Sequence, residues 1–320
     1  MTNILAVVST DDYRSVRFTL SQPLDAKKAL FYGQFVQAAY TMFKHPEGPD
    51  PLRPEPAGIP PTYELGAWIH MSDFILNLEE PVFYGIVAHA VQDPDSRIIA
   101  IRGTEGPLEW IDDGDAVPVA FRQVPDAGRV ACGFDKIYST LKVVKRTLPG
   151  AVARAETAGP ETFSGSFAQQ LEQLAISREA ERGERLPAAE GRTRPKRPTV
   201  VTGHSLGAAL ATLFVMENSA KGKFDISTIC TFASPRAGTG PFVQRFNQLP
   251  IDSWRIINQR DVVPKLPPHI PVILDYSHVE TAYPFDSSEF VRNNLLCWHS
   301  METYLHWLDS SSPLLPECRP

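Results

Sequence analysis

The spacing of apolar residues in the first third of the chain predicts one helix followed by a β-hairpin. Over residues 25–44 apolar side chains recur every three or four positions, and Asp25 is placed to cap the helix. Residues 45–62 hold seven prolines, which remove backbone donors and predict a loop. Two β-rich runs at 82–90 and 97–102 flank a cluster of turn-forming residues, so we expect them to pair as a hairpin.

The last third of the chain alternates short β-rich runs with helical patterns. The β-rich runs cover 200–202, 226–232 and 254–258, and the helical patterns between them cover 206–218 and 241–248. Strands that alternate with helices are typical of a parallel sheet with helices on both of its faces. The pattern therefore predicts an α/β fold.

The middle of the chain has the weakest pattern. A helix is predicted at 136–147, and a second amphipathic stretch lies at 163–181. Residues 150–198 are rich in alanine, glutamate and arginine and end in a basic run. We interpret 150–198 as a surface insertion in a single domain that spans residues 1–320. The basic run is interpreted as a solvated linker rather than a nucleic-acid site.

Charge and hydropathy narrow the range of partners. The 320 residues carry a net charge of −6 with both signs scattered along the chain, which argues against nucleic acid and against a strongly anionic membrane. No apolar run approaches the roughly 20 residues that span a bilayer, so we expect no transmembrane segment. The first residues do not resemble a signal peptide, which favours a cytoplasmic protein. Leaderless export, which leaves no such trace, stays open.

The cysteines suggest neither a metal site nor a disulfide framework. There are four of them, all after residue 130: Cys132, Cys230, Cys297 and Cys318. None lies at metal-ligand spacing, and four cysteines in a chain this long are too few for a disulfide scaffold. We expect all four to be reduced thiols.

The strongest chemical signal is a serine between two glycines, Ser205 in the pentapeptide Gly203-His204-Ser205-Leu206-Gly207. The pentapeptide alone is a weak signal, but a β-branched run precedes it and an Ala/Leu-rich helical pattern follows it. A sharp turn between a strand and a helix lifts such a serine above the sheet edge and aims the helix N-terminus at it. Ser205 is therefore the candidate nucleophile.

Five segments, in the family's order, resemble the class 3 lipase family of fungal-lipase-like α/β-hydrolases: Ile101–Thr104, Trp110–Asp113, Gly203–Gly207, Thr231–Gly238 and Arg255–Pro264. The resemblance covers roughly residues 27–148 and 198–309. It implies the α/β-hydrolase fold, in which helices flank a mostly parallel central sheet. It also implies hydrolysis of lipid esters by a Ser-His-Asp triad.

The acid of the triad must follow a later strand, because the chain order in this fold is serine, acid, histidine. Asp261 comes after the β-rich run 254–258 and matches the family's acid in its Asp-x-Val-Pro pattern. Asp252 precedes that run and so lies at the wrong end of the sheet. Asp275 is the alternative to Asp261.

Four histidines follow Asp261 and are candidates for the base: His269, His278, His299 and His306. His299 opens a predicted helix at 299–309, which is where the family's catalytic histidine lies in its His-x-x-x-x-Tyr pattern. His306 lies two turns further along and would be displaced by about 10 Å. We therefore favour His299 and interpret His306 as a packing residue. His204 is expected to belong to the framework of the turn.

The oxyanion hole and a lid follow from the same resemblance. Two backbone N–H groups must face the forming oxyanion, and the candidates are those of Leu206 and Thr104. The segment 105–116 resembles the family's lid, with three apolar residues facing an acyl pocket: Leu108, Trp110 and Ile111. An alternative interpretation is a surface helix that covers the core.

These residues predict a serine carboxylic-ester hydrolase of the triacylglycerol-lipase type that needs no metal and no organic cofactor. Its partners would be a lipid or other ester substrate and, transiently, a lipid interface. A phospholipase A1 and a short-chain esterase share this chemistry and remain alternatives. A catalytically silent lipase-like binding module is a further alternative, although all three triad residues are present.

Overall fold

The computed structural model describes residues 23–72, 81–104, 116–147, 161–183, 197–270 and 274–320. Within these residues one eight-stranded sheet carries the fold, in the order β12-β10-β8-β7-β3-β2-β1-β6. The strands are β1 Tyr63–Ser72, β2 Pro81–Ala90, β3 Arg97–Ile101, β6 Lys142–Lys145, β7 Arg197–His204, β8 Phe224–Phe232, β10 Asp252–Asn258 and β12 Ala282–Phe285. From β3 to β12 neighbouring strands are parallel, whereas β2, β1 and β6 are antiparallel to their neighbours.

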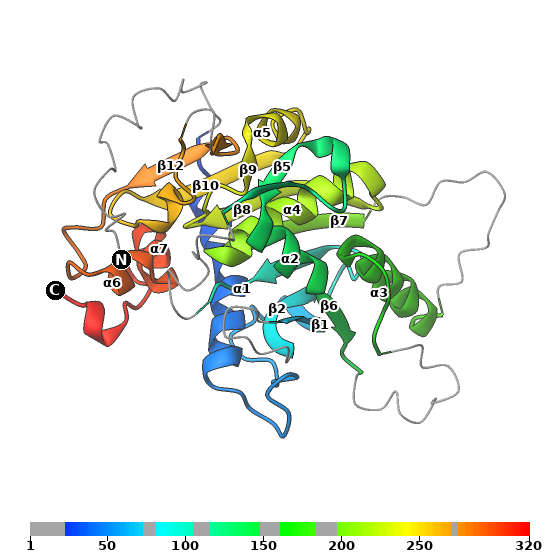
Figure 1. The fold of residues 1–320 in the computed structure, drawn as a ribbon. Helices are drawn as coiled ribbons and strands as arrows, with labels where there is room; N and C mark the ends of the chain where they lie inside the picture. The colour runs from blue at the N-terminus through cyan, green and yellow to red at the C-terminus, as the bar shows by residue number, and fades with distance from the viewer. Residues whose placement is uncertain (1–22, 73–80, 105–115, 148–160, 184–196, 271–273) are drawn as a thin grey trace.

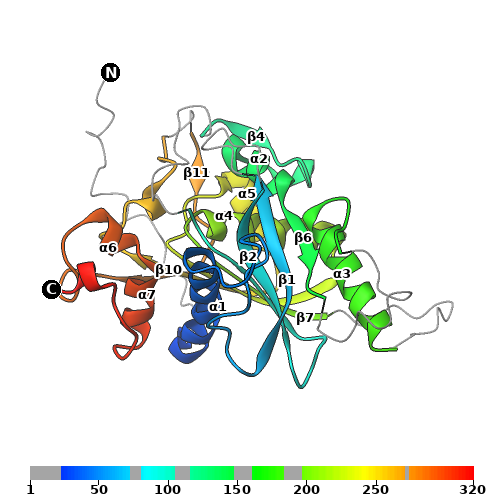
Figure 2. The same ribbon diagram turned by 90° about the horizontal axis from the view of Figure 1, so that it is seen from below.

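Helices cover both faces of this sheet (Figures 1 and 2). The helices are α1 Ala26–Lys44, α2 Cys132–Thr140, α3 Phe167–Glu181, α4 Leu206–Lys221, α5 Gly240–Phe246, α6 Leu295–His299 and α7 Met301–Leu308, with short 3₁₀ turns η2 Pro125–Ala127, η4 Val263–Lys265 and η5 Pro316–Cys318. A smaller sheet is formed by β4 Pro118–Ala120, β5 Arg129–Ala131, β9 Gly238–Thr239 and β11 Tyr276–Ser277. The arrangement confirms the predicted α/β-hydrolase fold.

Strand β3 shows how the sequence builds the two core layers. Alternate side chains of a strand point to opposite faces. Ile98 and Ala100 accordingly belong to the apolar cluster that contains α1 and α7, and Ile99 and Ile101 to the cluster that contains α2, α3 and α4. A strand covered on both faces carries apolar side chains at successive positions, as β3 does from Ile98 to Ile101.

The predicted helix at 136–147 is wrong in its second half. Helix α2 ends at Thr140, and β6 pairs with β1 through Lys142–Lys145. Leu141 turns the backbone to an extended conformation, and the β-branched pair Val143 and Val144 is buried in the sheet edge. Tertiary pairing here outweighs the helical pattern of the preceding residues.

The described part of segment 150–198 carries helix α3, which packs on the sheet face that α4 covers. Phe167, Leu171 and Leu174 are buried in that core layer. The side-chain oxygen of Gln170 accepts the N–H of Val143, and its amide nitrogen donates to the carbonyl of Leu141. These contacts tie α3 to β6, and the apolar face of this helix belongs to the packed core.

The predicted helix at 299–309 is divided into two. Ser300 has an extended backbone (φ −63°, ψ 139°), so α6 ends at His299 and α7 begins at Met301. The hydroxyl of Ser300 accepts the N–H of Thr303 and caps α7. His299 therefore lies at the end of a short helix and does not open a long one.

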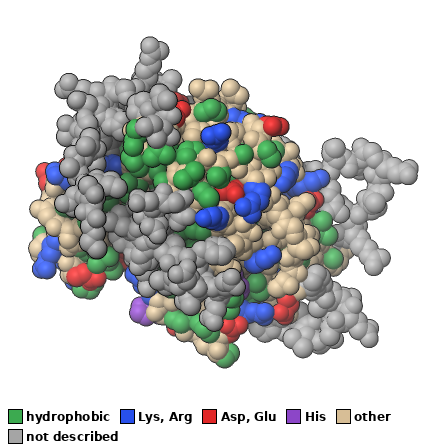
Figure 3. All heavy atoms as spheres, viewed as in Figure 1, with side chains coloured by type: hydrophobic (Ala, Val, Ile, Leu, Met, Phe, Trp, Pro, Cys, Tyr) green, Lys and Arg blue, Asp and Glu red, His purple; other side chains and the backbone are tan. Residues whose placement is uncertain are grey.

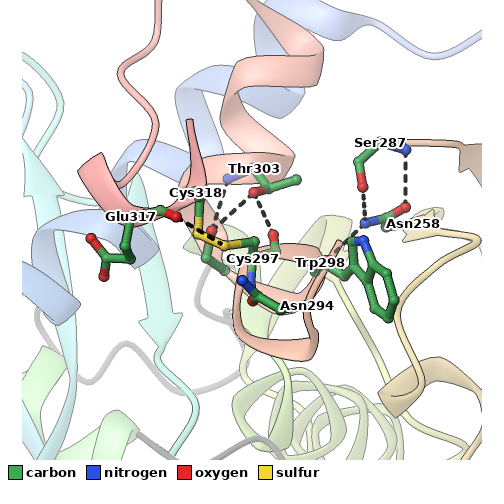
Figure 4. Close-up of a disulfide and its surroundings, with 9 residues drawn as sticks. Asn258, Ser287, Asn294, Cys297, Trp298, Thr303, Glu317 and Cys318 are labelled. Atoms are coloured by element: carbon green, nitrogen blue, oxygen red, sulfur yellow. Dashed lines mark hydrogen bonds between the residues drawn. A yellow bond between two sulfur atoms is a disulfide. The ribbon is translucent and has the colours of Figure 1, made fainter. Parts of the chain in front are cut away.

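The expectation of four reduced thiols is wrong for one pair. Cys297 in α6 and Cys318 in η5 form a disulfide, because the chain turns back after α7 and lays its last residues against α6 (Figure 4). Both sulfurs are buried in a small apolar cluster that also contains Val291. Cys132 and Cys230 are free.

The surface agrees with the scattered charge of the sequence. On the face shown in Figure 3 both signs of charge are present, and apolar side chains gather beside them. Among the described residues, no helix is long and apolar enough to cross a membrane.

Candidate active site

Ser205 occupies the turn between β7 and α4 with a strained backbone (φ 56°, ψ −129°). Such a conformation costs about 1–3 kcal/mol in a non-glycine residue and is kept only where the surroundings enforce it. The N–H of Ser205 donates to the carbonyl of Phe232 at 3.0 Å, which ties the turn to β8. A Cβ at Gly207 would overlap the carbonyl oxygens of Ile101 and Arg102, so the turn requires glycine there.

The structure brings Ser205, His299 and Asp261 into one line of hydrogen bonds. Nε2 of His299 lies 2.8 Å from Oγ of Ser205, and Nδ1 lies 2.7 Å from Oδ2 of Asp261. A carboxylate only accepts, so Nδ1 carries the proton and the lone pair of Nε2 faces the serine hydroxyl. All three side chains are buried. This geometry suits proton transfer from Ser205 to His299.

Asp261 is held by two further donors. Its Oδ1 accepts the N–H of Val263 at 2.9 Å, and its Oδ2 also accepts the hydroxyl of Tyr304 at 2.8 Å. These bonds fix the carboxylate, only 1% exposed, on the loop after β10. Asp275 lies elsewhere, more than half exposed and beside His269, and Asp252 begins β10 at its opposite end.

The backbone of α6 is held by side chains from other elements. The hydroxyl of Thr303 donates to the carbonyl of Cys297 at 2.6 Å, and Nδ2 of Asn258 donates to the carbonyl of Trp298 at 2.8 Å (Figure 4). Asn258 also donates to Oγ of Ser287. The turn that carries His299 is thereby fixed against the end of β10.

His204 links this turn to the loop after β3. Its Nε2 donates to the carbonyl of His299 at 2.8 Å, so its Nδ1 accepts the hydroxyl of Tyr40, also at 2.8 Å. The oxygen of Tyr40 in turn accepts the N–H of Gly103 at 2.8 Å. Burial holds the pKa of His204 well below its ordinary value, and the nearby His299 lowers it further, so the ring is neutral. These two hydrogen bonds require a neutral His204, because one ring nitrogen must donate and the other must accept.

The loop after β3 lies directly against the nucleophile. A Cβ at Gly103 would come within 2.7 Å of Cβ of Ser205. The buried guanidinium of Arg102 donates to the carbonyl of Gly103 at 2.7 Å and holds the start of the loop. Thr104, the next residue, is itself buried. The N–H of Leu206 belongs to the first turn of α4, whose amides have no acceptor within the helix. Thr104 and Leu206 thus flank Ser205 from two elements.

Comparison with known proteins decides the family. A model of the family described as Lipase (class 3) matches residues 98–270, more than half of the chain. The chain belongs to the class 3 lipase family.

Several curated relatives of this class 3 lipase are plant phospholipases. Phospholipase A1-II 4 of Oryza sativa subsp. japonica is 31% identical over 224 residues, which cover 65% of this chain and 49% of that protein. Phospholipase A1-II 6 of the same plant is 33% identical over 227 residues, with the same two shares. The chain therefore spans about half the length of the curated relatives it matches.

Solved lipase structures share the fold of this class 3 lipase. The native Rhizomucor miehei lipase in complex with its propeptide superposes with a TM-score of 0.50 at 20% identity, over 82% of this chain and 69% of that one. The mono- and diacylglycerol lipase of Aspergillus oryzae superposes with a TM-score of 0.50 at 17% identity, over 82% of this chain and 80% of that one. At these identities the likeness concerns the fold.

The other candidate residues of this class 3 lipase lie away from the serine or outside the described residues. Nδ1 of His306 bonds the carbonyl of Ser312, while His278 and His269 bond the carbonyls of Pro264 and Tyr276. The predicted lid residues Leu108, Trp110 and Ile111 lie outside the described residues. Among the described side chains, no three His, Cys, Asp or Glu residues gather in a way that would hold a metal ion.

Sequence reasoning missed the residues that support the triad. Tyr304 fits the His-x-x-x-x-Tyr pattern that starts at His299, and this was a usable signal for its bond to Asp261. Tyr40 and Asn258 gave no comparable signal. In the sequence Tyr40 is one of several aromatic residues on the apolar face of α1, and Asn258 only marks the end of a strand.

Proposed function

We propose that this chain is a serine carboxylic-ester hydrolase that acts on lipid esters, with Ser205 as its nucleophile. One observation carries the proposal: an unbroken line of short hydrogen bonds runs from Ser205 through His299 to Asp261 at a strained turn between strand and helix. A serine in a merely structural turn needs neither a buried histidine nor a buried carboxylate behind it.

The mechanism follows from the roles that the geometry allows. His299, oriented by Asp261, removes the proton of Ser205 as Oγ attacks the ester carbonyl. The N–H groups of Thr104 and Leu206 stabilise the tetrahedral oxyanion. His299 then donates its proton to the alcohol oxygen, the alcohol leaves, and an acyl-enzyme forms. A water molecule, deprotonated by His299, hydrolyses the acyl-enzyme and restores Ser205.

Two lipid classes are candidate substrates. A triacylglycerol-lipase type of specificity is supported by the fungal fold alone. The curated relatives that are 31% and 33% identical to this chain over the matched residues are named phospholipases A1, which favours glycerophospholipids. We propose hydrolysis of lipid esters as the common activity and phospholipase A1 as the favoured form.

The proposal is tested with p-nitrophenyl esters from C2 to C16, with and without a detergent or lipid interface. The wild-type chain should release p-nitrophenol across part of this series, and Ser205→Ala should lose the activity while remaining folded. The catalytically silent alternative predicts no turnover of any ester by the wild-type chain. That result would end the proposal.

A further inference from the structure

A cavity of about 210 Å³ lies beside the triad, between the C-terminal end of α1 and the junction of α6 and α7. Thr104 and His299 both line it, so it adjoins the oxyanion loop and the base at once. Its apolar wall includes Leu296, Met301 and Leu315. Leu296 remains 48% exposed, which leaves the mouth of the cavity with an apolar rim.

The chemistry of ester cleavage assigns this cavity to the alcohol half of the substrate. The leaving oxygen must take its proton from Nε2 of His299, so it must lie within hydrogen-bond distance of that atom. The carbonyl oxygen faces the backbone of Thr104 at the same moment. A group attached to the leaving oxygen therefore extends past His299, where this cavity lies.

Two opposite charges line the cavity without neutralising each other. Lys44 is the last residue of α1 and is exposed, and Glu302 lies in the first turn of α7 and is half-buried. Neither forms an ion pair with any residue that the structure describes. The Lys44 ammonium lies 5.8 Å from the ring centroid of Tyr40, and Glu302 accepts a hydrogen bond from Gln37 at 3.1 Å.

The positions of Lys44 and Glu302 at helix termini explain why their charges are stable there, but do not explain a function. A cation at a helix C-terminus and an anion at a helix N-terminus are each favourable. That account is satisfied by either residue alone and on any surface. It does not explain why both charges face one cavity beside His299.

Resting on the proposed function, we propose that this cavity receives the zwitterionic head group of a glycerophospholipid. Lys44 contacts the phosphate, Glu302 contacts the ammonium group, and the apolar rim meets the glycerol end of the lipid. The lysine ammonium donates a charge-assisted hydrogen bond to a phosphate. The quaternary ammonium of a choline head group has no N–H, so its contact with the carboxylate is electrostatic alone. Neutral glycerides offer neither charge, so these two residues determine head-group specificity and take no part in the chemical step.

Three lipids with identical oleoyl chains separate the two contacts: phosphatidylcholine, phosphatidic acid and diacylglycerol, each in Triton X-100 micelles. Lys44→Met should lower kcat/KM for both phosphate-bearing lipids about fivefold to tenfold relative to diacylglycerol, the range expected for one charged contact near the surface. Glu302→Gln should lower kcat/KM for phosphatidylcholine relative to phosphatidic acid. The exposed residues Lys27 and Glu289 provide the matched controls Lys27→Met and Glu289→Gln, which should leave all ratios unchanged. Equal losses on all three lipids would overturn the proposal.

A second readout needs no turnover. In the Ser205→Ala chain, acetylation by an N-hydroxysuccinimide ester should be slower at Lys44 in phosphatidylcholine micelles than in diacylglycerol micelles, while Lys27 reacts equally in both. Equal labelling of Lys44 in both micelles would refute the head-group site even if the enzyme hydrolyses esters. Failure of the wild-type chain on every ester, with Lys44 still protected, would refute the proposed function and leave the head-group site standing.

Discussion

Ser205 is placed by its neighbours in the sequence, whereas His299 is placed by residues from several distant elements. The serine turn is marked in the sequence by the strand before it, the helix after it and Gly207, and a backbone bond to Phe232 of β8 holds it in place. The histidine lies in a helix of five residues, too short to be stable alone. That helix is fixed by bonds that span 40 residues to Asn258 and 95 residues to His204. The nucleophile is thus a local feature of the chain, and its base is a product of the whole fold.

The largest effect should separate the two histidines of the C-terminal region. His299→Ala removes the group that accepts the serine proton, so kcat/KM should fall by roughly 10⁴–10⁶-fold. His306→Ala loses only a bond to the carbonyl of Ser312 and a ring contact with Phe290, so the loss should be at most about tenfold. Steady-state hydrolysis of p-nitrophenyl butyrate measures both variants, and the reverse order of effects would move the base to His306.

Removing the disulfide tests whether the region around His299 depends on contacts between residues far apart in the sequence. Cys297 and Cys318 close a loop of 21 residues, for which the loss of the bond costs about 3 kcal/mol of unfolding free energy. Cys318→Ser should show that loss in urea denaturation, whereas Cys132→Ser, at a free cysteine, should show little. Activity of the folded Cys318→Ser chain should fall less than tenfold, because Asn258 and His204 still hold α6. Unchanged stability would show that the disulfide does not support this region.

Tyr304→Phe removes a hydrogen bond to the carboxylate of the triad and leaves the His299 side chain in place. The variant removes one of the donors to Oδ2 of Asp261 and the acceptor of the Asn258 N–H, while keeping the buried ring. A hydrogen bond to a charged group is worth about 1.5–3 kcal/mol, so kcat should fall by roughly tenfold to a hundredfold with little change in KM. Tyr283→Phe, at a half-buried tyrosine of β12, is the matched control. A rise in KM alone would indicate a role in binding rather than in positioning Asp261.

Buried histidines make the stability of the folded chain sensitive to acid. Burial lowers the pKa of His204 and His278 well below 6.5 and that of His89 to about 3, so all three are neutral in the folded chain. The unfolded chain takes up protons first as the pH falls below 6.5. Each histidine then costs about 1.4 kcal/mol of unfolding free energy per pH unit, with no effect above that pH.

Urea unfolding at pH 8, 6.5, 5.5 and 5 measures this slope. His89→Gln, which leaves the relay through His204 intact, should make the slope shallower. Stability that stays constant from pH 6.5 to 5 would show that the buried rings accept protons in the folded chain.

The difference between the two regions explains what the sequence could predict. The pentapeptide around Ser205, the strand before it and the helix after it could be predicted because the pattern is local. Asp261 followed from chain order, and His299 required the family pattern as well. Three features depend on contacts between segments far apart in the sequence: the break at Ser300, the Cys297–Cys318 disulfide and the role of Tyr40. The local spacing of residues does not predict such contacts.

The central claim is that His299 activates Ser205, and labelling with a fluorophosphonate tests it most directly. The reagent should react once per wild-type chain, and peptide mapping by mass spectrometry should place the label on Ser205. Labelling should be lost in Ser205→Ala, be slowed by several orders of magnitude in His299→Ala, and continue at close to the wild-type rate in His306→Ala. Labelling that persists in Ser205→Ala, or that proceeds at the wild-type rate in His299→Ala, would contradict the account.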